Sequence, residues 1–151
     1  MIGHSANVIP LSTLKVECRD CTLFQLCLPI GVDKADLVLL DRIIKRRRPV
    51  KRGEYLYRAG DAFESIYAVK SGSFKTSTIT EEGREQVTGL HLPGELFGMD
   101  AISSGTHCCS AVALERSSVC EIPFSQLEEL GAQIPSLMRQ TVRIMSKEIL
   151  R

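Results

Sequence analysis

Hydrophobic positions divide the chain into three parts with different spacing. Between residues 33 and 44 apolar side chains recur every three or four positions, which predicts a short amphipathic helix with Asp33 as its N-cap. From residue 49 to about 122, glycines separate short segments rich in β-branched and aromatic residues, a spacing typical of antiparallel strands. After Pro123 the spacing becomes helical again. The chain should therefore fold as a β-rich body between helices.

The middle part contains six segments that favour strands. They are residues 55–57, 65–69, 73–79, 86–92, 110–114 and 117–122. The sequence Thr-Glu-Glu-Gly at 80–83 predicts a hairpin tip between the third and the fourth. Six to eight strands are enough to close a barrel or a two-sheet roll that protects its edges.

The C-terminal part predicts a short helix over 123–130 and a longer one that opens at Ile134-Pro135. In the longer helix a narrow apolar stripe follows a 4, 3, 4 spacing: Met138, Val142, Met145 and Ile149. Leu137 and Ile144 broaden this stripe on one side and should cover the roll, which leaves the stripe for another contact. No capping residue precedes Arg151, so we expect this helix to be truncated.

Four of the six cysteines suggest a thiolate cage. Cys18, Cys21 and Cys27 have the spacing C-x2-C-x5-C on an N-terminal segment with little to fold around, and Cys120 lies far downstream. Such ligands could hold a tetrahedral zinc, a single iron or an iron-sulfur cluster, and the spacing does not choose among them. Bound metal would tie the segment to the body; the alternative is a tail without a ligand.

The remaining composition narrows the functional class. No signal peptide opens the chain and no apolar stretch approaches about 18 residues, so we expect a cytoplasmic protein without a membrane partner, in which thiols bind metal rather than form disulfides. The net charge of +1 demands no polyanionic partner, and the basic run at 45–52 is expected to be a solvated strand edge. No catalytic constellation is visible, so the protein should not be an enzyme.

The sequence His107-Cys108-Cys109 is a second conceivable ligand site. It has no partner at a metal-binding spacing, and Cys108 and Cys109 fit the alternative of small buried apolar residues.

Two further motifs carry a resemblance. Glycine-spaced strands, then Gly-Glu-Leu-Phe-Gly at 94–98, Val-Cys-Glu-Ile-Pro-Phe at 119–124 and a long helix resemble the cyclic-nucleotide-binding-like regulators of bacterial transcription. The four cysteines, together with residues 85–95, resemble the oxygen-sensing branch of that family, the fumarate and nitrate reduction regulators.

The resemblance implies a mainly β fold with helices. Residues 1–30 would form a cysteine arm. Residues 31–132 would begin with the short helix and form a double-stranded β-helix, that is, a cyclic-nucleotide-binding-like roll. Residues 133–151 would be the start of a dimerisation helix, and the helix-turn-helix domain of the family would be missing. It also implies a 4Fe-4S cluster on Cys18, Cys21, Cys27 and Cys120, which promotes a homodimer through the stripe Met138, Val142, Met145 and Ile149. The full-length protein would then bind DNA and activate transcription under anaerobic conditions, and RNA polymerase would be contacted by Glu81, Glu82, Gly83 and Arg84.

Two alternatives stay open. One is a cyclic-nucleotide effector domain, because Gly94-Glu95-Leu96 matches the start of a phosphate-binding cassette. Nucleotide-binding relatives need an arginine before a Ser/Thr-Ala pair, and here Cys109 precedes Ser110-Ala111, so we expect no cyclic nucleotide to bind. The other alternative is a zinc-stapled structural module.

Overall fold

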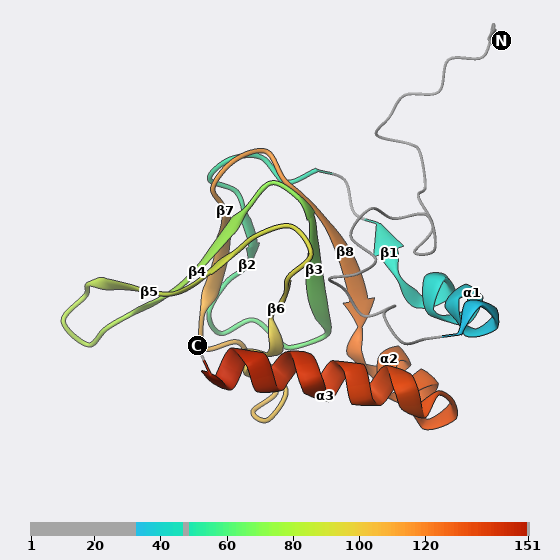
Figure 1. Cartoon of the computed structure of the whole chain (residues 1–151). Helices are drawn as coiled ribbons and strands as arrows, with labels where there is room; N and C mark the ends of the chain where they lie inside the picture. The colour runs from blue at the N-terminus through green and yellow to red at the C-terminus, as the bar shows by residue number, and fades with distance from the viewer. Residues whose placement is uncertain (1–32, 47–48, 151) are drawn as a thin grey trace, which may run out of the picture.

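The fold is a β-roll with helices at both ends of the chain (Figure 1). This computed structural model describes residues 33–46 and 49–150, so residues 1–30 and with them Cys18, Cys21 and Cys27 lie outside the described residues. In chain order the described elements are α1 (Lys34–Ile43), β1 (Lys45–Arg46), β2 (Tyr55–Tyr57), β3 (Ser65–Ser71), β4 (Phe74–Ile79), β5 (Glu85–His91), β6 (Leu96–Phe97), the 3-10 turn η4 (Met99–Ala101), β7 (Ser110–Ala113), β8 (Ser118–Pro123), α2 (Phe124–Gln133) and α3 (Pro135–Leu150).

The strands form two antiparallel sheets of four, in the orders β1-β8-β3-β6 and β2-β7-β4-β5. Side chains from both sheets meet in an interior core that includes Val69, Phe74, Phe97 and Val119. The predicted mainly β roll is therefore confirmed. All six predicted strands are present with small shifts at their ends, whereas the two-residue strands β1 and β6 were missed.

A second core, here called the outer core, lies between the first sheet and the three helices. Strand β3 contributes to both cores, because Tyr67 and Val69 belong to the interior core while Ile66 and Ala68 belong to the outer one. The helices supply the other side of the outer core through buried leucines, among them Leu37, Leu40, Leu127, Leu130 and Leu137. A strand covered on both faces needs an unbroken apolar run, which explains why residues 65–69 are all buried.

Helix α1 begins where the sequence predicts, but its cap differs from the prediction. The Asp33 side chain makes no capping hydrogen bond. Its backbone carbonyl accepts from the N–H groups of Asp36 and Leu37 instead. The helix is thus held mainly by burial of its apolar face rather than by its cap.

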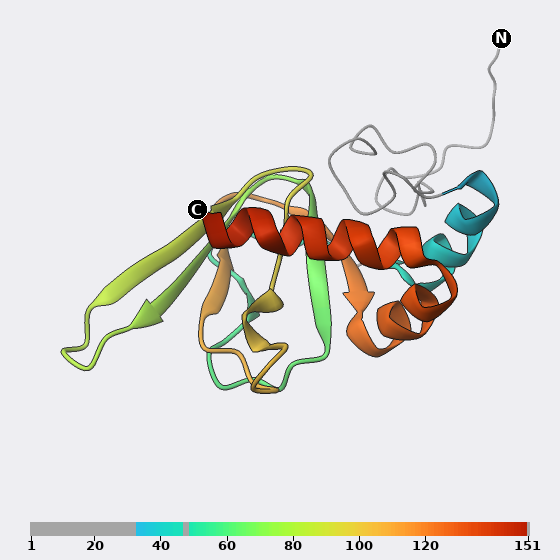
Figure 2. The same ribbon diagram turned by 60° about the horizontal axis from the view of Figure 1, so that its bottom comes forward.

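Helix α3 runs along one side of the roll (Figures 1 and 2). Leu137 and Thr141 are fully buried, and Ile144 packs against the outer core, so the predicted inner flank is confirmed. The burial of Thr141 was not expected from its polarity. Its Oγ1 donates to the Leu137 carbonyl at 2.9 Å, which satisfies the hydroxyl within the helix.

The β4–β5 hairpin projects from the roll (Figure 2). Its tip is a tight turn in which Gly83 has φ +83°, a left-handed conformation that favours glycine. The Thr80 N–H donates to the Arg84 carbonyl at 2.8 Å and closes the turn, as predicted. Among the described helices, none is long and apolar enough to cross a membrane.

Candidate functional site

Cys120 lies near the middle of β8, half-buried at the edge of the outer core. Its register partners are Ala68 of β3 on one side and Arg46 of β1 on the other. Because side chains alternate along a strand, Cys120 shares its face with Ile122 of the outer core, while Val119 points into the roll. The thiol is therefore directed to the side of the sheet that the helices cover.

The same core connects Cys120 with the start of the described chain. Leu37 and Leu40 of α1 are buried in the outer core, against which Cys120 packs. Cys27 stands six positions before Asp33 in the sequence. Six extended residues span at most about 20 Å, which is the greatest distance that Cys27 can lie from Asp33. The other three cysteines are not described, and the four-cysteine ligand set stays a prediction.

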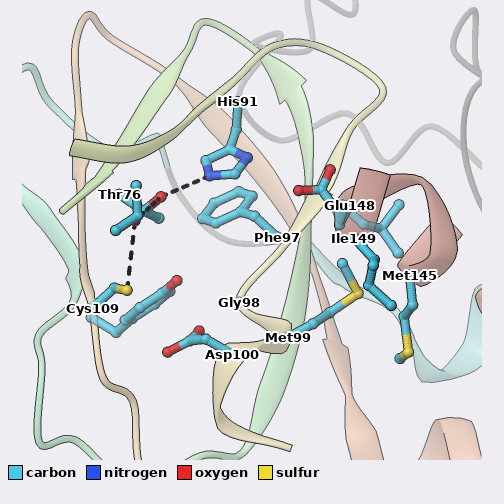
Figure 3. A pocket seen from close by; sticks show the side chains of 13 residues that line it. Thr76, His91, Phe97, Gly98, Met99, Asp100, Cys109, Met145, Glu148 and Ile149 are labelled. Atoms are coloured by element: carbon cyan, nitrogen blue, oxygen red, sulfur yellow. Dashed lines mark hydrogen bonds between the residues drawn. The ribbon is translucent and has the colours of Figure 1, made fainter. Parts of the chain in front are cut away.

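A pocket of ≈ 410 Å³ opens between the roll and the C-terminal end of α3. Figure 3 shows Thr76, His91, Phe97 and Cys109 on the roll side, facing Met145, Glu148 and Ile149 of α3. The His91 ring stacks on Phe97 with centroids 4.8 Å apart, and its Nε2 lies 3.0 Å from Thr76 Oγ1. The floor of the pocket is thus aromatic and held in place by hydrogen bonds.

The charges of this pocket disfavour an anionic ligand. Its lining includes Asp100 and Glu148 but no lysine or arginine among the described residues. The two segments that resemble a phosphate-binding cassette contain Glu95 and Ser110, and both side chains bond to the protein's own backbone. Glu95 Oε1 accepts from the Leu92 N–H at 2.8 Å, and Ser110 Oγ accepts from the Ala59 N–H at 2.9 Å. A cyclic phosphate would meet carboxylates without a compensating cation. The absence of cyclic-nucleotide binding remains a prediction.

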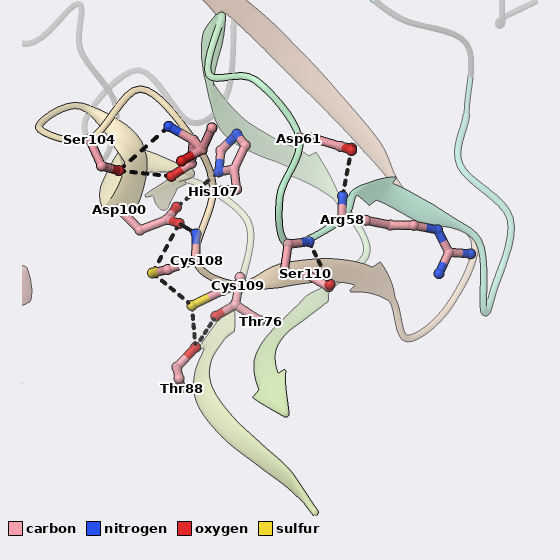
Figure 4. Close-up of polar contacts among 12 residues, drawn as sticks. Arg58, Asp61, Thr76, Thr88, Asp100, Ser104, His107, Cys108, Cys109 and Ser110 are labelled. Atoms are coloured by element: carbon pink, nitrogen blue, oxygen red, sulfur yellow. Dashed lines mark hydrogen bonds and ion pairs between the residues drawn. The ribbon is translucent and has the colours of Figure 1, made fainter. Parts of the chain in front are cut away.

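At the mouth of the pocket, two thiols and a carboxylate come together (Figure 4). The ligand atoms of Asp100, Cys108 and Cys109 all lie within 4.8 Å of one another. Cys108 Sγ is 3.4 Å from Asp100 Oδ2 and 3.6 Å from Cys109 Sγ. Asp100 was not predicted as a partner of these cysteines, because it comes close to them only through the fold. Cys108 is exposed, which corrects its interpretation as a buried apolar residue, whereas Cys109 is buried.

The local environment keeps the Cys108 thiol protonated. Desolvation, followed by hydrogen bonds with Cys109 and Asp100, raises the pKa of Cys108 to about 12. Tyr57, beside this group, has a buried hydroxyl without a hydrogen-bond partner. Burial and the neighbouring Asp100 raise the pKa of Tyr57 as well. Among the described residues that line this pocket beside Asp100, none is a lysine or arginine.

The predicted dimer stripe divides into two kinds of positions. Val142 and Ile149 are exposed at 57% and 84%, whereas Met138 and Met145 are half-buried. Met138 packs against Gly131 of α2 where a Cβ would collide with it, so this methionine fixes the α2–α3 contact. A groove of ≈ 650 Å³ along α3 is lined by Met138, Arg139, Val142 and Arg143, among others. The structure thus exposes apolar surface along the helix, and the dimer seam stays a prediction.

The expected polymerase contact lies at the tip of the β4–β5 hairpin. Glu81, Glu82, Gly83 and Arg84 are all exposed there. No other described segment covers this tip, and the polymerase contact also stays a prediction.

Comparison with known proteins assigns the family. The model of the cyclic nucleotide-binding domain matches residues 47–133. The chain belongs to the cyclic nucleotide-binding domain family. Within this family it groups with the fumarate and nitrate reduction regulators, as the sequence resemblance indicated. It is 51% identical over 135 residues to the transcriptional activator protein Anr of Pseudomonas protegens, and the matched region covers 89% of this chain and 55% of that protein.

A second relative gives the same picture. The fumarate and nitrate reduction regulatory protein of Escherichia coli is 49% identical over 134 residues, covering 89% of this chain and 54% of that protein. The chain thus spans about half the length of these family members. Among solved structures, the catabolite activator protein of Thermus thermophilus matches the fold with a TM-score of 0.71 at 24% identity, covering 81% of this chain and 57% of that chain. The sensor domain of the regulator DNR of Pseudomonas aeruginosa matches the fold with a TM-score of 0.64 at 17% identity, covering 83% of this chain and 79% of that chain.

Proposed function

We propose that this chain is the oxygen- and redox-sensing domain of an iron-sulfur transcription regulator. In this proposal Cys18, Cys21, Cys27 and Cys120 hold a 4Fe-4S cluster. The cluster promotes a homodimer through α3, and the longer protein then binds DNA and activates transcription in the absence of oxygen. The similarity to regulators named for fumarate and nitrate reduction and to the activator Anr supports this role.

The observation that carries the proposal is the placement of Cys120. A cysteine ligand must be reachable by the other three, and its sulfur must be accessible from outside the roll. Cys120 is half-buried at the margin of the outer core, on the side of the sheet where α1 packs, and this placement supports its role as the fourth ligand. The side chain of the neighbouring residue, Val119, points into the interior core. A thiol at that position would be enclosed by the roll and closed to ligands from outside.

The residues around Cys120 have separable tasks. When bound, the cluster supplies a redox centre whose properties depend on solvent access and on hydrogen bonds to the sulfurs. Leu37 and Leu40 anchor α1 on the outer core, against which Cys120 also packs. Ile122 and Ala68 shield the base of Cys120 from water on the sheet side. Thiolate ligation would thus order an arm that has little core of its own.

Helix α3 is connected to this region through the same core. Leu137 and Ile144 pack in the outer core with α1 and Cys120, while Val142 and Ile149 lie on the solvent side of the helix. A change in the packing of α1 would therefore be transmitted to a helix that exposes Val142 and Ile149. A symmetric pair of such helices would bury Val142 and Ile149 from both copies.

The experiment is sedimentation of the protein with its cluster, before and after exposure to air. We expect a larger dimer fraction in the anaerobic, cluster-loaded sample and dissociation as the visible absorption bleaches. A colourless protein that binds zinc and dimerises equally in air would instead support the zinc-stapled module. A dimer fraction that does not change on bleaching would contradict the proposed switch.

A further inference from the structure

The group formed by Asp100, Cys108 and Cys109 has no part in the proposed iron-sulfur site. Cys120 packs against the outer core, whereas Cys109 lines the pocket between the roll and α3 together with Tyr57 and Asp100. Two different faces of the roll therefore carry thiols. We propose that Asp100, Cys108 and Cys109 form a second metal site, for a thiophilic divalent ion of the zinc type, at the mouth of this pocket.

The distances within the group fit tetrahedral coordination. With Zn–S bonds of about 2.3 Å and Zn–O bonds of about 2.1 Å, a tetrahedral site has S···S edges of about 3.8 Å and S···O edges of about 3.6 Å. The two thiols of Cys108 and Cys109 are 3.6 Å apart, and Cys108 Sγ is 3.4 Å from Asp100 Oδ2. Along these two edges an ion needs shifts of only a few tenths of an ångström. The third edge, between Cys109 Sγ and the Asp100 carboxylate, is at most 4.8 Å, so the two side chains must approach by no more than about 1.2 Å.

The ligands are held by further hydrogen bonds, as metal ligands usually are. The carboxylate of Asp100 accepts from the Cys108 backbone N–H at 2.9 Å through Oδ2, and its Oδ1 lies 3.2 Å from His107 Nδ1. On the other side, Thr88 Oγ1 donates to Cys109 Sγ at 3.6 Å. Figure 4 shows these contacts between Asp100 of η4, Thr88 of β5 and the residues that directly precede β7.

An independent sign of a ligand is the Tyr57 hydroxyl. Tyr57 is only 6% exposed, lines the same pocket as Asp100 and Cys109, and has no hydrogen-bond partner for its hydroxyl. Its ring is fixed by stacking on His107, with centroids 3.8 Å apart. A three-ligand site leaves a fourth position for water, and such a water at the pocket mouth would give the hydroxyl a partner.

The chemistry of the donors selects the kind of ion. Two thiolates and a carboxylate favour zinc-like ions over Mg²⁺ or Ca²⁺, which prefer oxygen ligands. The absence of lysine and arginine from the described pocket lining means that an incoming cation meets no like charge there. Binding would release protons from the thiols.

The test is a Co²⁺ titration of the whole chain with Cys18→Ser, Cys21→Ser and Cys27→Ser, under nitrogen with a phosphine reductant. These substitutions remove competing thiolates of the arm. We expect one equivalent of Co²⁺ with the intense visible absorption of tetrahedral thiolate coordination, displaced by Zn²⁺ but not by Mg²⁺. Weak absorption of octahedral cobalt, or no binding, would overturn the proposal.

Added substitutions locate the ion. The double variant Cys108→Ser and Cys109→Ser should lose the absorption. Removing a residue that only hydrogen-bonds to a metal ligand typically lowers metal affinity about 10- to 100-fold. Asp100→Asn removes the charge of a ligand itself and should therefore lower the affinity at least tenfold. Glu129→Gln neutralises an exposed carboxylate on α2 and should change nothing. Absorption that survives the double variant, or disappears with Cys120→Ser, would assign the ion to other thiols and contradict the site. Circular dichroism of each variant confirms that it is folded.

Discussion

Cys120 is the register partner of Arg46, the last residue of the short strand that follows helix α1. The predicted downstream ligand is therefore paired with the strand that directly follows α1, the first helix that the structure describes after the other three cysteines in the sequence. The connection depends on α1 being anchored, which Leu37 and Leu40 achieve in the outer core. This relationship makes the anchoring of α1 a part of the proposed sensor.

The first prediction concerns that anchor. Leu40 is fully buried, so Leu40→Ala should lower the free energy of unfolding by about 2–5 kcal/mol. Leu39, its neighbour, is 36% exposed, and Leu39→Ala should cost less than about 1 kcal/mol. Urea unfolding of both variants measures the difference. Equal losses would show that α1 is not held by the outer core.

Much of this fold could be predicted from the sequence because its signals are local. Glycine-bounded strands, the turn at Gly83 and the proline that opens α3 all follow from backbone preferences of single residues. Strands β1 and β6 were not predicted, because a segment of two residues is too short to show the alternation of a strand. Each is defined by its pairing, β1 with β8 and β6 with β3.

The site was predictable to a smaller extent. The spacing of the N-terminal cysteines indicates ligands and Cys120 is a candidate fourth ligand, while the resemblance specifies that the group they hold is a 4Fe-4S cluster. Cys108 and Cys109 were a conceivable ligand site in the sequence, but their partner Asp100 could not be predicted, because it reaches them through the path of the chain from η4 to β7 rather than through spacing. The division of the α3 stripe depends on Met138 packing against Gly131, which helical periodicity does not reveal.

The second prediction concerns the outer face of α3. Val142 is 57% exposed, so Val142→Glu should change the free energy of unfolding by no more than about 0.5 kcal/mol. It should nevertheless abolish dimerisation of the cluster-loaded protein, because it would place two like charges in the seam. Gln133→Glu adds the same charge at an exposed position of α2 and should leave the dimer intact. Anaerobic sedimentation compares the two, and an unimpaired Val142→Glu dimer would rule out this seam.

The third prediction concerns the Cys108 thiol in protein freed of metal by a chelator. Because burial and hydrogen bonds with Cys109 and Asp100 raise its pKa to about 12, the thiolate is scarce at pH 8. The rate of alkylation by iodoacetamide should rise about tenfold per pH unit from pH 8 towards pH 11. Peptide mass spectrometry gives the rate at Cys108, with the urea-unfolded protein as reference.

The role of the carboxylate follows from the same measurement. Asp100→Asn removes a negative charge and should lower the pKa of Cys108, so its alkylation at pH 8 should become several-fold faster. A rate that levels off near pH 9 in the unsubstituted protein would contradict the raised pKa.

The fourth prediction concerns cyclic nucleotides. The pocket lining carries Asp100 and Glu148 without a lysine or arginine among the described residues, so calorimetric titration with cyclic AMP should give no binding. Micromolar affinity would restore the effector-domain alternative.

The most direct test of the central claim is an iron and sulfide count after anaerobic reconstitution, on the unsubstituted chain and on Cys120→Ser. We predict about four iron and four sulfide per chain for the former, with visible absorption that air bleaches, as expected of one 4Fe-4S cluster. Cys120→Ser should retain little of either, while Cys108→Ser matches the unsubstituted chain. A full and stable complement of iron and sulfide in Cys120→Ser would contradict the account.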